Sequence, residues 1–114
     1  MIAVGVKYFI TKEVGTISAN TTKDVEFSWH ETVRVHRIFF IERSGASLAK
    51  VNVTIKWGAD DVITRESVPA SIFAYDPSKA FVLDRELKSD LLVKFSFTNN
   101  DSSDKDLVIV FECY

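Results

Sequence analysis

Two strand-like runs and a polar loop make up Lys88-Ser-Asp-Leu-Leu-Val-Lys-Phe-Ser-Phe-Thr-Asn-Asn-Asp-Ser-Ser-Asp-Lys-Asp-Leu-Val-Ile-Val-Phe-Glu-Cys-Tyr114, the stretch that decides the fold. In the first run apolar and polar residues alternate, which is the period of a strand buried on one face. Its apolar positions are Leu91, Val93, Phe95 and Phe97. The second run, Leu107 to Phe111, is apolar on both faces, as in a strand covered on both sides. The loop Asn99 to Asp106 has no apolar residue. The pattern predicts a hairpin of two strands.

The rest of the chain repeats this rhythm of short strands and turns. The clearest strand is Val51 to Trp57, where apolar and polar residues alternate throughout. With only four glycines for tight turns, several links should cross between sheets. We therefore expect an all-β protein, an antiparallel β-sandwich of about eight strands with jelly-roll or Greek-key connections. Residues 1–114 should form a single domain, with residues 1–12 as an edge strand or N-terminal arm.

Composition excludes several classes of protein. The chain has 114 residues, 46% of them hydrophobic, and a net charge of −2, so nothing attracts nucleic acid over long range. No apolar run reaches the roughly 18 residues of a membrane span. The N-terminus lacks the basic start of a signal peptide, which predicts synthesis in a cytosol. The single cysteine, Cys113, is in phase with apolar neighbours and predicts a buried thiol.

One strand has an ambiguous phase. Val33 and Val35 alternate with polar residues, but four apolar residues then follow one another from Ile38 to Ile41. Arg37 falls where the alternation requires an inward residue. A β-bulge near His36-Arg37 would restore the phase by inserting one extra residue. The alternative is a strand that begins exposed and ends covered on both faces.

No catalytic signature is present, and the chain is not expected to be an enzyme or to need a cofactor. His30, Glu31 and His36 could share a zinc ion only on a continuous strand, and the turn-like Glu31-Thr32 interrupts it. We predict no metal there. The oxygen-rich loop Asn99 to Asp106 could wrap calcium, but it lacks the glycine and the final glutamate of a helical calcium loop. A solvated loop is the simpler interpretation.

The surplus of apolar residues is more informative than the polar ones. A two-sheet sandwich buries only its inner faces, so the outer residues of the doubly apolar runs need a cover. Continuous alternation assigns Ile38, Phe40, Val108 and Val110 to that outer set. The cover could come from the N-terminal arm or from another subunit, and exposed apolar patches of this size usually mark an interface. We therefore predict that these four residues form an interface and that the chain self-associates. Tyr75, in a loop beside a proline, is the best candidate for an exposed aromatic that faces a ligand such as a carbohydrate.

The order of strands and loops along the chain resembles that of a family of viral proteins. Lys23-Asp-Val-Glu-Phe-Ser-Trp29 leads to Thr32-Val-Arg-Val-His-Arg-Ile-Phe-Phe40, and the two runs of the last third follow. This rhythm resembles small single jelly-roll structural proteins of the capsid, penton or turret type. The resemblance implies a noncatalytic shell subunit in a virion, made in the host cytoplasm, that contacts itself or other shell proteins. The alternative function is a β-sandwich module that binds carbohydrate or attaches to a host, and a cupin-like enzyme is the least favoured. If the protein is not part of a virion, we expect it in the cytoplasm.

Overall fold

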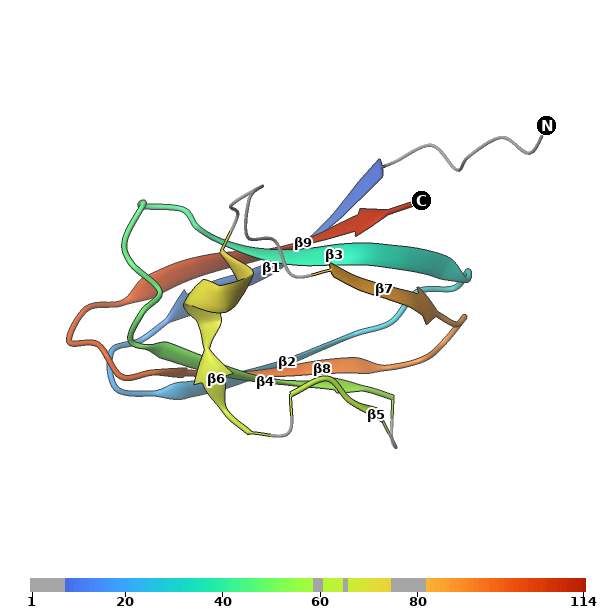
Figure 1. The fold of residues 1–114 in the computed structure, drawn as a ribbon. Helices are drawn as coiled ribbons and strands as arrows, with labels where there is room; N and C mark the ends of the chain where they lie inside the picture. Colours follow the sequence, from blue (N-terminus) through green and yellow to red (C-terminus); the bar gives the residue numbers. More distant parts are fainter. Residues whose placement is uncertain (1–7, 59–60, 65, 75–81) are drawn as a thin grey trace.

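The protein is a two-layered β-sandwich in the computed structural model, which describes residues 8–58, 61–64, 66–74 and 82–114 (Figure 1). The four-stranded sheet has the order β1-β9-β3-β7, and the five-stranded sheet has the order β2-β8-β4-β5, with β6 also paired to β4. All of the strand pairs in these sheets are antiparallel. The predicted all-β, antiparallel sandwich is therefore confirmed.

The elements have the following bounds. The strands are β1 Tyr8–Ile17, β2 Thr22–Phe27, β3 Val33–Glu42, β4 Val51–Trp57, β5 Asp61–Val62, β6 Val68–Pro69, β7 Val82–Leu87, β8 Val93–Asn99 and β9 Lys105–Cys113. A short 3-10 helix, η1 Ala70–Phe73, follows β6. Among the residues described above, no helix has the length and apolar character needed to cross a bilayer.

The strand pairings are nested, which gives the fold its topology. β1 pairs with β9, β2 with β8, β3 with β7, and β4 with both β5 and β6. This is the pattern of one long antiparallel hairpin. Rolling that hairpin up adds the pairs β3 with β9 and β4 with β8. The result is a jelly roll, as predicted.

The two strands at the end of the chain do not form the expected hairpin with each other. β8 lies between β2 and β4, whereas β9 lies between β1 and β3 in the opposite sheet. The polar loop between them therefore crosses from one layer to the other (Figure 1). Both strands are central in their sheets, and each contributes one face to the core.

A bulge in β3 sets the direction of its side chains. Val35 pairs with Cys113 and Arg37 with Glu112, so His36 is the extra residue. The predicted bulge is confirmed, and it reverses the phase of everything after it. Ile38 and Phe40 were expected on the outer face but are buried in the core. Continuous alternation across His36 produced that error.

Phenylalanines from both sheets fill the core. Phe40 of β3 has its ring centroid 5.1 Å from that of Phe97 and 6.0 Å from that of Phe95, both on β8. Phe73 of η1 lies 5.1 Å from Phe40 on another side. Phe111 of β9 contacts Phe95 at 6.0 Å. These ring contacts join the two layers and η1 into one core, and spacings of this kind favour tilted aromatic pairs.

β1 is the edge strand of the four-stranded sheet. It runs from Tyr8 to Ile17 with an irregularity between Glu13 and Gly15, where Gly15 has φ +79°. Residues 1–7, part of the predicted edge strand or arm, lie outside the described residues. Tyr75, the predicted ligand-facing aromatic, also lies outside them.

Candidate functional site

The outer face of the four-stranded sheet carries a row of apolar side chains. Phe39 of β3 pairs with Val110 of β9, and Ile41 pairs with Val108. On the neighbouring edge strand, Phe9 lies close enough to Val110, Phe39 and Ile41 for the three strands to line one open depression of about 350 Å³. We call the following set the apolar outer face: Phe9, Phe39, Ile41, Val108 and Val110.

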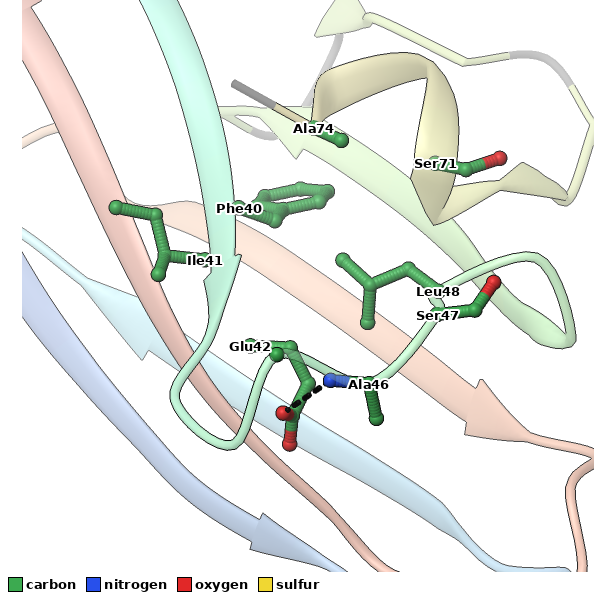
Figure 2. Close-up of a pocket in the computed structure, with 9 residues that line it drawn as sticks. Phe40, Ile41, Glu42, Ala46, Ser47, Leu48, Ser71 and Ala74 are labelled. Atoms are coloured by element: carbon green, nitrogen blue, oxygen red, sulfur yellow. Dashed lines mark hydrogen bonds between the residues drawn. The ribbon is translucent and has the colours of Figure 1, made fainter. Parts of the chain in front are cut away.

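Two side chains of the apolar outer face are open to solvent. Phe9 is 63% exposed and Ile41 is 43% exposed, whereas Phe39 is only 3% exposed. Phe39 nevertheless lies apart from the core cluster that contains Phe40. Figure 2 shows Ile41 pointing away from the side of β3 that carries Phe40. Large exposed apolar side chains on one sheet face are typical of interaction surfaces.

Val108 and Val110 were predicted for this face, but Phe9, Phe39 and Ile41 were not. Phe39 and Ile41 follow from the bulge hypothesis once it is applied to the rest of β3. Phe9 could not be found in this way, because its position depends on the pairing of β1 with β9 at the other end of the chain. Of the four residues predicted for this face, Val108 and Val110 lie on it, whereas Ile38 and Phe40 lie in the core.

Charged pairs lie at both ends of the apolar outer face. At one end Nε of Arg37 lies 3.7 Å from Oε2 of Glu112. At the other end Nε of Arg43 donates to Oε1 of Glu13 at 3.1 Å and lies 4.0 Å from Oδ1 of Asp106. An apolar centre with a charged rim is the usual anatomy of a protein interface.

Glu42 is a buried carboxylate that organises the loop after β3. Its Oε1 accepts hydrogen bonds from the backbone N–H of Ser44 at 2.7 Å and of Ala46 at 3.1 Å, and from the Ser44 hydroxyl. Its Oε2 accepts from the N–H of Asp106 at 2.7 Å. Burial acts to raise the pKa of Glu42, but these hydrogen bonds, led by that from Asp106, outweigh it and lower the pKa to about 2.

A groove of about 440 Å³ lies between this loop and η1 (Figure 2). Phe40 and Leu48 form its apolar floor, and Ser71 and Ala74 form its other wall. The carboxylate of Glu42 borders it, yet both of its oxygens already accept hydrogen bonds from the protein. A carboxylate held in this way stabilises the loop and is poorly suited to take up a proton during catalysis.

The loop that was weighed as a calcium site is held by a lysine. Nζ of Lys105 lies 3.0 Å from Oδ2 of Asp101 and 3.3 Å from Oγ of Ser103, and the Lys105 side chain is buried. The hydrogen bond from Lys105 is the main reason why the pKa of Asp101 is lowered. The ammonium group thus takes the place that a bound cation would have. Oδ1 of Asp104 accepts instead from the N–H of Ala19 at 2.9 Å.

The buried side chain of Asn99 also stabilises the loop between β8 and β9. Its fully buried amide donates to the carbonyl of Ile17 at 3.1 Å and to that of Ser103 at 2.9 Å. Its carbonyl oxygen accepts from the N–H of Asp101 at 3.0 Å. The crossover between β8 and β9 is therefore closed by the protein's own donors and acceptors, as a structural loop requires.

The histidines and the cysteine do not converge. His30 is fully exposed in the loop before β3, with Nδ1 3.6 Å from Oδ1 of Asp90, whereas His36 packs its ring against Tyr114 at 5.5 Å. Burial, with a smaller effect of the Glu112 charge, raises the pKa of the Cys113 thiol to about 11. Within the described part of the chain, no three His, Cys, Asp or Glu residues are grouped as metal ligands.

Both tryptophans pack toward the interior, which weakens the carbohydrate alternative. Trp57 is buried and donates from Nε1 to the carbonyl of Glu86 at 3.1 Å. Trp29 packs its ring edge-on against Phe111 at 5.1 Å, and Nζ of Lys12 lies 5.3 Å from its centroid. Sugar binding by stacking needs an exposed flat ring, and neither tryptophan offers one.

No protein-family model matches the chain. No curated protein matches it either. Among solved structures, the chain is similar to the crystal structure of the core of Drosophila NLP, a study of pentamer formation and histone binding. The sequence identity is 16%, the TM-score is 0.40, and the alignment covers 96% of this chain and 99% of that one.

The comparison corrects the expectation drawn from the viral resemblance. The solved structure is the core of a fly protein described for pentamers and histones, not a capsid, penton or turret protein. The predicted role as a viral shell subunit is therefore wrong, and so are the locations expected with it, the virion or otherwise the cytoplasm. The expected shell-protein partners lose their basis as well.

Proposed function

We propose that this protein is a noncatalytic jelly-roll domain that self-associates through the outer face of its four-stranded sheet. The observation that carries the proposal is the apolar outer face itself, with Phe9 and Ile41 open to solvent. A single copy leaves these side chains in water. A second copy would bury them, at a gain of about 25 cal/mol for each Å² of apolar surface.

The charges around the apolar outer face favour another copy of the chain over a strongly charged partner. Arg37 and Glu112 at one end, and Arg43 and Glu13 at the other, balance each other locally. The apolar outer face therefore has no net charge of one sign that would attract a highly basic or a highly acidic partner. The buried carboxylate Glu42 and the buried thiol Cys113 are both engaged in structure, which supports the noncatalytic part of the proposal.

Val110→Asp should abolish self-association. Val110 lies in the middle of the apolar outer face, and a carboxylate there would have to lose its hydration without a partner when two copies meet. We expect light scattering to give an oligomer mass for the wild-type chain and a monomer mass for the variant at the same concentration.

Leu92→Asp is the matched control for this experiment. Leu92 is also an exposed apolar residue, at 52%, but it precedes β8 in the opposite sheet. This variant should keep the oligomer mass, and circular dichroism should show that both variants are folded. A wild-type chain that stays monomeric at high concentration would refute the proposal.

A further inference from the structure

β1 forms one edge of the four-stranded sheet, and its outer side could pair with another strand. It has ten residues, from Tyr8 to Ile17, and β9 is the only described strand that pairs with it. Its first residues, Tyr8-Phe-Ile-Thr11, all favour strands. An edge of this length and composition is a template to which a second copy could add its own β1, so that the sheet extends from copy to copy.

Lys12 interrupts the apolar pattern on the core side of β1. It pairs with Ile109, which is fully buried, and residues directly opposite each other in a sheet point to the same face. Two residues earlier, Ile10 points the same way and packs against the core. The alternation therefore requires an apolar residue at position 12, and the chain has a lysine there.

The ammonium group of Lys12 lies between the edges of the two sheets. Its Nζ is 5.3 Å from the ring centroid of Trp29 and 5.9 Å from that of Phe27, the last residue of β2. β2 is the edge strand of the five-stranded sheet. The faces of the two rings attract the cation, and the half-buried lysine keeps contact with water on this side of the sandwich.

A bulge directly after Lys12 makes the same edge irregular. The register with β9 shifts between Glu13 and Gly15, so Val14 is an extra residue. A bulge bends the strand and disturbs the regular spacing of its backbone N–H and C=O groups. A straight strand could therefore add to β1 only before the bulge, in the part that contains Lys12.

We propose that Lys12 and the bulge at Val14 prevent the edge of β1 from pairing with the same edge of a second copy. If two sheets joined there, the second copy would cover the side of the sandwich where Lys12 lies. Tyr8 and Ile10 of the second β1 would arrive on this side, and neither carries a negative charge. The ammonium group would lose its water without an ionic partner, which strongly opposes such pairing.

Lys12→Val tests the proposal. Valine favours strands and completes the apolar core side of β1, so this variant should pair through the edge. Light scattering should give at least about twice the wild-type mass at the same concentration, rising further with concentration. Lys12→Thr, which also removes the charge, should show the same growth, so the result does not depend on the folding of one variant. Lys12→Arg keeps the cation over the rings and should have the wild-type mass.

Lys94→Val is the matched control. It introduces the same residue on the exposed face of β8, which is paired on both sides, with β2 and with β4. An added valine without an unpaired backbone edge should leave the mass at the wild-type value. Circular dichroism should show that all of these variants are folded. If Lys94→Val grew as Lys12→Val does, or if neither Lys12→Val nor Lys12→Thr grew, the lysine would not protect the edge.

The double variant Lys12→Val with Val110→Asp separates the edge of β1 from the apolar outer face. It should still form the larger species, because pairing through the edge does not use Val110. Loss of the larger species in the double variant would mean that the added association uses the outer face, and the proposal would be wrong. A monomeric wild-type chain would refute the proposed function alone, since the variants at position 12 would then be compared with a monomer.

Discussion

Phe40→Ala should lower the free energy of unfolding by about 3–5 kcal/mol, the usual cost of removing a fully buried phenylalanine. Phe40 is 1% exposed and contacts the rings of Phe73, Phe95 and Phe97. Truncation would leave a cavity where the two sheets meet, and the rings that line it come from three different elements. This cost is a large fraction of the roughly 5–15 kcal/mol that holds a typical domain together.

Urea denaturation followed by tryptophan fluorescence measures this effect, since Trp29 and Trp57 both pack near the core. Leu92→Ala is the control, because it truncates a 52% exposed apolar side chain just before β8, away from the apolar outer face. The control should change the stability of the monomer by no more than about 0.5–1 kcal/mol. If Phe40→Ala were as mild as the control, Phe40 would belong to the surface, as continuous alternation had predicted.

Much of the fold can be predicted from strand periodicity alone. Val51 to Trp57 matches β4, and the alternating run before the polar loop includes β8. The second apolar run matches the nine-residue β9, whose residues alternate between the core and the outer face. These elements share a strict period of two, which depends only on local backbone geometry.

The pairing of the strands is not predictable in the same way. Two apolar runs that are neighbours in sequence suggest a hairpin, yet β8 and β9 lie in opposite sheets. The loop between them is held by contacts to residues far away in the chain, such as the bond from the Asn99 amide to the carbonyl of Ile17. Nothing in the local pattern contains this information.

The candidate surface shows the same division between local and distant information. Val108 and Val110 are outward because β9 is regular, and the sequence is sufficient to place them. Phe39 and Ile41 depend on whether one residue, His36, is counted in the alternation. The charged residues Glu42 and Lys105 are buried on the core side of their strands. For Glu42, leaving His36 out of the alternation along β3 would have predicted this direction.

Glu42→Gln should lower the free energy of unfolding by about 2–3 kcal/mol at neutral pH. The folded pKa of Glu42 is about 2, against an ordinary value of 4.5, and a difference of that size corresponds to about 3 kcal/mol of stabilisation of the charged form. The glutamine amide would keep one acceptor oxygen. Its NH₂ group would face the N–H of Asp106 or of Ser44, which now donate to the carboxylate.

The pH dependence identifies the carboxylate as the cause. Because the folded pKa lies below the unfolded one, the unfolded chain binds more protons between about pH 2 and pH 5, and acid removes the stabilisation. The stability difference between wild type and Glu42→Gln should therefore be full above about pH 5 and should shrink as the pH falls toward 2. Urea denaturation at a series of pH values measures it.

Glu26→Gln serves as the control for this series, since Glu26 pairs with Lys94 on the exposed face of the other sheet at 3.5 Å. Exposed pairs of this kind contribute about 0–1 kcal/mol, so this variant should follow the wild-type curve closely. A difference between wild type and Glu42→Gln that stays constant from pH 2 to pH 7 would mean that packing, rather than the charge of Glu42, accounts for the loss. In that case the loop after β3 would not depend on an ionised carboxylate, and the position of Arg43 at the rim of the apolar outer face would need another cause.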